Sequence, residues 1–61
     1  MYETFERLLA EKGVTAYKCA QETGISQVVF SEWKRGKSKP KADKLKKLAD
    51  YFGVPIEKFI E

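Results

Sequence analysis

The chain has 61 residues, a single cysteine and no histidine, and its formal net charge is +3. A chain of this length forms one small domain near the lower limit at which a single core sustains itself, which leaves little room for an enzyme's substrate cleft. One cysteine excludes an internal disulfide and fits the reducing cytoplasm, and the lack of histidine excludes a His/Cys zinc site and histidine-based catalysis. We therefore expect no enzymatic activity, no metal or other cofactor, and no small-molecule ligand.

The N-terminal stretch MYETFERLLAEKG is amphipathic and acid-rich, unlike a signal peptide, and no apolar run reaches membrane-spanning length. The chain also contains no linker and no internal repeat. The expectation is one soluble, cytoplasmic domain over residues 1–61, with no contact to a membrane.

Hydrophobic periodicity predicts the first two helices. One spans residues 2–12 and ends at Gly13, and its apolar side chains recur at i, i+3 and i+4: Phe5, Leu8 and Leu9. The second begins at the cap residue Thr15 and stops at Gly24, and it turns three side chains inward: Cys19, Ala20 and Thr23.

The third predicted helix, residues 26–35, is capped by Ser26 and buries Phe30 and Trp33 on one face. Only residues 24–26 separate it from the second helix. Two helices joined so briefly cross steeply, in the geometry of a helix-turn-helix.

Two more helices follow a lysine-rich loop that contains Pro40. The fourth stops at Gly53, and its apolar positions are Ala42, Leu45, Leu48, Ala49 and Phe52. Pro55 suits the first turn of a short fifth helix, in which Ile56, Phe59 and Ile60 face inward. No alternating strand pattern competes, so the predicted fold is all-α, a compact five-helix domain.

Charge is concentrated in residues 34–47, which hold eight of the twelve basic residues and one of the nine acidic ones. That segment carries +7, and the four basic and eight acidic residues elsewhere leave −4. A basic block on a small domain is typical of a protein with an anionic partner, although a solvated loop that keeps the protein soluble gives the same pattern.

The pattern TAYKCAQETGISQVVFSEWKRGKSKP…LKKLADYFGVPIEKFI resembles the Cro/repressor-type (XRE-like) helix-turn-helix family of bacterial and phage regulators, which have the lambda-repressor-like fold. The resemblance runs from about Thr15 to Ile60 and places the helix-turn-helix at residues 15–35. Its most specific parts are TGIS, WKRGKSKP and LADYFGVPIEKFI. It implies that the third helix enters the DNA major groove while the second crosses the backbone.

The resemblance also implies two sets of DNA contacts. The positions that match base-contacting residues are Gln27, Val28, Ser31 and Glu32. The phosphate-contacting set comprises Tyr17, Lys18, Ser26, Arg35, Lys37 and Lys39. Many members carry a phosphate-binding glutamine where this chain has Ala16, and Tyr17 or Lys18 would substitute for it. Side-chain chemistry agrees, because Gln pairs with adenine, Val contacts a thymine methyl, Glu accepts from cytosine N4, and lysines bind phosphates.

Several of these residues have a simpler structural interpretation. Tyr17 packs on the first helix, and Glu32 pairs with Arg35 at i, i+3 instead of touching a base. Trp33 belongs to the core rather than to a base-stacking platform, and Cys19 is a small buried hydrophobe rather than a redox sensor. The lysines of the fourth helix form a solvated face: Lys44, Lys46 and Lys47.

The function predicted from these features is that of a sequence-specific, double-stranded DNA-binding transcriptional regulator acting as a repressor. The alternative is a protein-interaction or antitoxin-like module with the same fold. The family resemblance further implies a weak homodimer on two half-sites, and its predicted interface comprises Val54, Ile56, Phe59 and Ile60.

Overall fold

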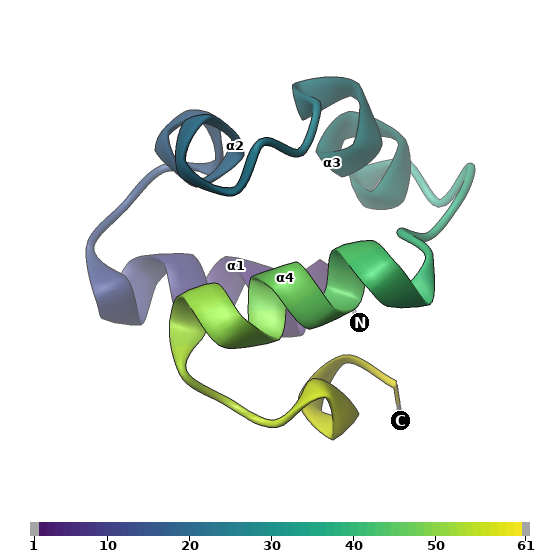
Figure 1. Cartoon of the computed structure of the whole chain (residues 1–61). Helices are drawn as coiled ribbons and strands as arrows, with labels where there is room; N and C mark the ends of the chain where they lie inside the picture. Colours follow the sequence, from purple (N-terminus) through teal and green to yellow (C-terminus); the bar gives the residue numbers. More distant parts are fainter. Residues whose placement is uncertain (1, 61) are drawn as a thin grey trace.

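Four α-helices and one 3-10 turn make up the structure of this chain, a computed structural model that describes residues 2–60 (Figure 1). They are α1 (Tyr2–Lys12), α2 (Ala16–Thr23), α3 (Gln27–Lys34), α4 (Ala42–Phe52) and the 3-10 turn η1 (Ile56–Phe59). No β-strand occurs within the described residues, so the all-α prediction is confirmed. None of these helices is long and apolar enough to cross a bilayer.

The prediction of a fifth α-helix is wrong. Pro55 precedes the turn in an extended conformation, with ψ of 147°, instead of opening a helix from within its first turn. The backbone bonds that follow are of the i to i+3 type: Lys58 N–H donates to the Pro55 carbonyl at 3.1 Å, and Ile60 N–H to the Glu57 carbonyl at 3.2 Å. Such bonds close a 3-10 turn, which is seldom longer than a few residues.

The helices form two layers with the C-terminal turn beneath them. In Figure 1, α2 and α3 lie on one side of α1 and α4, and η1 lies on the opposite side, near the C-terminus. Helix α2 packs against α3 and α4, while η1 packs against α1 and α4. The pair α1 and α4 thus lies between the helix-turn-helix and the C-terminal turn.

The core is centred on Phe5, whose side chain is fully buried. Its ring lies 4.7 Å from that of Phe30, 5.4 Å from that of Trp33 and 6.0 Å from that of Phe52, measured between centroids. Phe59 completes this aromatic cluster from below, 6.2 Å from Trp33. The prediction that Trp33 belongs to the core is thus confirmed, and so is the burial of Cys19, whose side chain has no exposed surface.

The joint between α2 and α3 follows the predicted chemistry. The Thr15 hydroxyl accepts a hydrogen bond from Lys18 N–H, and the Ser26 hydroxyl accepts one from Val28 N–H, so each caps its helix. Gly24 ends α2 with φ of 76°, a left-handed conformation that costs a side-chain-bearing residue free energy. Ile25 is buried under the turn. These four residues fix the crossing of α2 and α3.

A polar contact ties α2 to α4. The Tyr51 hydroxyl donates to Glu22 Oε1 at 2.8 Å, and Lys18 Nζ lies 3.3 Å from the other oxygen of the same carboxylate. Lys12 Nζ lies 4.9 Å from the centroid of the Tyr51 ring. The first helix of the helix-turn-helix is therefore held against α4 by a contact between residues 29 positions apart in the chain.

Candidate nucleic-acid interface

The outward face of α3 carries the four residues predicted to contact bases. Gln27, Val28 and Ser31 are exposed, with Val28 at 61 %, and Glu32 is half-buried. The opposite face carries Phe30 and Trp33, which are 3 % and 4 % exposed. Burial on one side thus forces the other side of α3 into solvent.

These four residues form two ridges along the helix, each beside a hollow. Gln27 and Ser31 border a hollow of about 200 Å³ that reaches Ala16 at the start of α2. Val28 and Glu32 border a second one, of about 270 Å³, between α3 and the start of α4. The outward face of α3 is therefore a ridged surface with a depression on each side.

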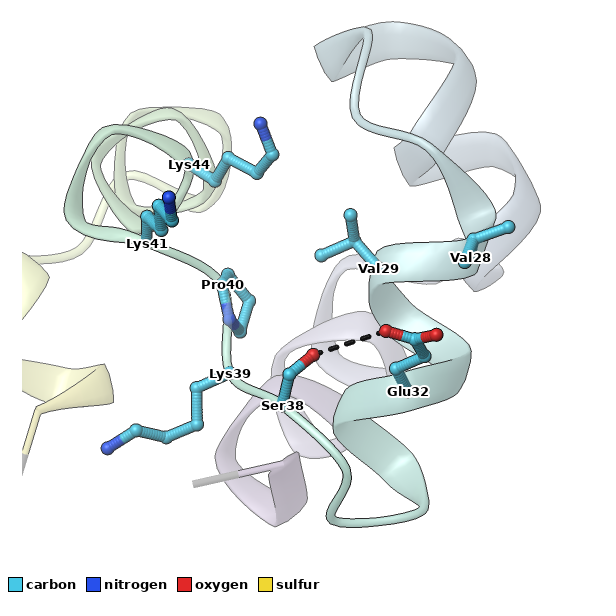
Figure 2. Close-up of a pocket in the computed structure, with 8 residues that line it drawn as sticks. All are labelled: Val28, Val29, Glu32, Ser38, Lys39, Pro40, Lys41 and Lys44. Carbon is cyan, nitrogen blue, oxygen red and sulfur yellow. Dashed lines mark hydrogen bonds between the residues drawn. The ribbon is translucent and has the colours of Figure 1, made fainter.

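The second hollow has an apolar floor and a cationic rim (Figure 2). Val29 points into it from α3, and Pro40, which is buried, lies between the two helices. Lys41 and Lys44 lie along its edge, whereas Lys39 lines it but directs its ammonium group away from it. The Glu32 carboxylate borders the same hollow, so side chains of both charges face it.

The loop after α3 is held in place by the way the helix ends. Gly36 adopts φ of 75°, Gly36 N–H donates to the Trp33 carbonyl at 3.0 Å, and Lys37 N–H donates to the Glu32 carbonyl at 2.9 Å. This pair of bonds is a Schellman motif, which requires a left-handed residue at the position of Gly36. The basic loop therefore leaves α3 in one defined direction.

Three predicted phosphate-contacting residues lie at this end of α3. Arg35 caps the helix at its C-terminus, Lys37 and Lys39 follow in the loop, and all three are exposed. Close by, Lys41 precedes Ala42, the first residue of α4, and its side chain forms no cap. Exposed basic residues thus extend from the end of α3 to the start of α4.

The other three predicted phosphate-contacting residues lie on or beside α2. Tyr17 is 56 % exposed, and its hydroxyl accepts a hydrogen bond from Gln21 Nε2 at 3.4 Å, within α2. Lys18 is engaged with Glu22. The Ser26 hydroxyl serves as the acceptor of its cap, which leaves its own hydrogen available to a phosphate oxygen.

Glu32 has a different partner from the one predicted. Its Oε1 accepts a hydrogen bond from the Ser38 hydroxyl at 3.3 Å (Figure 2), and no ion pair with Arg35 forms among the described residues. The Schellman motif explains this choice, because it turns the chain back so that Ser38 lies beside the helix.

The predicted dimer interface is smaller than expected. Phe59 is 1 % exposed and packs in the core near Trp33, so it offers no surface to a second copy. Val54 and Ile56 are half-buried against the core. Ile60, which was predicted to face inward, is 57 % exposed. Ile60 is therefore the most exposed of these four apolar residues.

The predicted DNA contacts leave out three basic residues that lie beside the outward face of α3. Lys34 borders the hollow beside Gln27 and Ser31, and Lys41 and Lys44 border the hollow beside Glu32. Lys44 had been assigned to a solvated face. The i, i+3 spacing of Lys41, the residue before α4, and Lys44, in its first turn, was a usable signal, because it places both side chains on one side of the start of that helix.

A helix-turn-helix family model matches residues 5–59 of the chain. No curated protein and no solved structure matches the chain. The match runs from within α1 to the end of η1, with the outward face of α3 and the basic loop inside it. Its members are DNA-binding regulators rather than enzymes, and this chain, with its capped α2–α3 joint and solvent-facing α3, belongs to the Cro/repressor-type (XRE) helix-turn-helix family.

Proposed function

We propose that this chain is a sequence-specific regulator that reads double-stranded DNA with α3 and represses transcription. One observation carries the proposal: the polar outward face of α3 is directly followed by the basic segment 34–47, which carries +7. A base-reading surface and a phosphate-binding surface are thus adjacent on one side of the domain. The first supplies sequence preference, and the second supplies affinity.

The chemistry of the outward face suits base edges. An eight-residue helix fits the major groove, where Gln27 can pair with adenine N6 and N7. Val28 offers an apolar contact to a thymine methyl, and the Glu32 carboxylate can accept from cytosine N4. Glu32 also repels phosphates, so it weakens binding to incorrect DNA sequences more than it strengthens binding to the correct one.

Repression would follow from occupancy of the promoter DNA by this protein. A protein seated in the groove of a promoter excludes other proteins from the same base pairs, and no further activity of the domain is needed. A single reading helix covers only a few base pairs, so we further propose a weak dimer on half-sites about one helical turn apart. Ile60 and the exposed parts of Val54 and Ile56 would form its contact.

The test begins with selection of bound duplexes from a random pool, followed by affinity measurements at several salt concentrations. Gln27→Ala should weaken the best site by about 1–3 kcal/mol and leave non-specific binding unchanged. The double variant Lys37→Ala/Lys39→Ala should weaken all duplexes and reduce the slope of log affinity against log salt by about 0.9 per lost contact.

A matched double variant, Lys46→Ala/Lys47→Ala, removes the same charge from exposed positions further along α4. It should change the salt slope less than the loop variant does. Selection that yields no preferred sequence, with weak retention of every duplex, would contradict the proposal and favour the protein-interaction module.

A further inference from the structure

Glu32 is joined to the loop after α3 through both its backbone and its side chain. Its carbonyl accepts from Lys37 N–H at 2.9 Å, and its carboxylate Oε1 accepts from the Ser38 hydroxyl at 3.3 Å. Figure 2 shows the carboxylate turned toward Ser38, with its second oxygen pointing away from the loop. The only acidic side chain of α3 is thus oriented by the residue that follows Lys37.

The surroundings of this carboxylate explain why its orientation needs support. Lys41 and Lys44 line the same hollow as Glu32, and they belong to the opposite wall (Figure 2). A glutamate side chain has several rotatable bonds, and nearby ammonium groups attract it. Without the Ser38 hydroxyl, the carboxylate is free to turn across the hollow toward these lysines and away from a base in the groove.

We propose that Ser38 is a specificity-determining residue that acts through Glu32. Its hydroxyl occupies Oε1, and the second oxygen is left to accept a hydrogen bond from the exocyclic amino group of a base, cytosine N4 by preference. This inference rests on the proposed reading of DNA by α3. Ser38 is a positioning residue, and it needs no contact of its own with the duplex.

The experiment compares the wild type with Ser38→Ala, Ser38→Thr and Glu32→Gln. Equilibrium affinities are measured on the selected best duplex and on every duplex that differs from it by one base pair. Glu32→Gln and Ser38→Ala should both reduce discrimination at the same single base pair, the latter by about two- to tenfold, the range expected for loss of one hydrogen bond. Ser38→Thr, which keeps the hydroxyl, should retain the discrimination.

Two readouts separate positioning from direct contact. The salt dependence of Ser38→Ala should equal that of the wild type, because no phosphate contact is lost. The double variant Ser38→Ala/Glu32→Gln should discriminate no worse than Glu32→Gln alone, since the two residues act as one unit. Thermal unfolding of each variant checks that the fold is intact.

Uniform weakening on all duplexes with a shallower salt slope would make Ser38 a phosphate contact and overturn the inference. So would unchanged discrimination in Ser38→Ala, or a further loss in the double variant. A wild type without base preference would instead contradict the proposed function itself. Base preference that is indifferent to Glu32→Gln would contradict only the role given to Glu32 and Ser38.

Discussion

The ring of Phe5 stacks on that of Phe30, with centroids 4.7 Å apart and an angle of 23° between the planes. Phe5 belongs to α1 and Phe30 to the buried face of α3, so the orientation of α3 depends on a helix that carries no proposed DNA contact. Trp33, one turn further along α3, lies 5.4 Å from the same ring. The core therefore positions the outward residues of α3.

Phe5→Ala, which removes the ring, should unfold a large fraction of the protein molecules. Truncating a buried phenylalanine to alanine costs about 3–5 kcal/mol, comparable with the whole stability of a small domain. Phe5→Leu fills part of the space and should remain folded with a lower melting temperature. Denaturant unfolding followed by the fluorescence of Trp33 measures both. The matched change Tyr17→Leu, at a position that is 56 % exposed, should alter stability by less than about 0.5 kcal/mol.

The uncapped start of α4 offers a stabilising substitution. Lys41 has the extended conformation of a cap residue, φ −74° and ψ 169°, but no side-chain hydrogen bond. Lys41→Ser supplies a hydroxyl acceptor for a free N–H group of the first turn, whereas Lys41→Ala removes the same charge without a cap. The serine variant should exceed the alanine variant in stability by about 0.5–2 kcal/mol. Equal melting temperatures of the two variants would show that the serine hydroxyl does not cap α4.

Acid should weaken the contact between α2 and α4. The Tyr51 hydroxyl and Lys18 lower the pKa of Glu22, so the folded state favours its ionised form. The stability that this carboxylate contributes is present above its ordinary pKa of 4.5 and is lost as the pH falls through its lower folded-state pKa. When the free energy of unfolding is measured against pH, Glu22→Gln should lose less stability in acid than the wild type does.

Tyr51→Phe provides the control for this pH dependence, because it removes the hydroxyl that has the largest influence on the Glu22 pKa. Tyr51→Phe, like Glu22→Gln, should lose less stability in acid than the wild type does. Adding Glu22→Gln to Tyr51→Phe should change this loss little further. Additive effects of the two substitutions would mean that the residues act independently.

Cys19 should resist thiol reagents while the chain is folded. Burial, with a smaller contribution from Glu22, raises the pKa of the Cys19 thiol to about 11 from an ordinary value of 9.0. At neutral pH this makes the reactive thiolate rarer than in an ordinary thiol, and the buried sulfur is reached only through opening of the domain. Reaction with a disulfide reagent should be slow in buffer and fast in denaturant.

A second thiol on the exposed side of α2 supplies the reference for this measurement. In Gln21→Cys, which keeps Cys19, one thiol should react fast and one slowly. Two fast phases would show that Cys19 is accessible in the folded protein.

Much of the fold could be predicted from local sequence. Thr15 and Ser26 cap their helices through atoms two or three residues away, and Gly24 ends α2 through its own backbone conformation. The apolar spacing in α1 and α3 identified Phe5, Phe30 and Trp33 as core, because a helix presents every third or fourth residue on one side. The basic segment was visible from counting charges alone.

Other features were decided only by contacts between residues distant in the sequence. Phe59 is buried and Ile60 exposed because one 3-10 turn, held on α1 and α4, directs Phe59 toward Trp33 and leaves Ile60 outside. Both are large apolar residues, and helical spacing assigned them to the same face. Their sequence does not distinguish them, since the surface that receives Phe59 is built by other helices.

The partner of Glu32 was decided in the same way. Helical spacing offered Arg35, but the reversal of the chain at Gly36 brings the Ser38 hydroxyl to the carboxylate instead. A helix fixes the distance between residues one turn apart, so the sequence shows which partners are within reach of one another but not which contact forms. Contacts across a turn, or between α1, α3 and η1, depend on how the whole chain packs, and only the tertiary structure determines them.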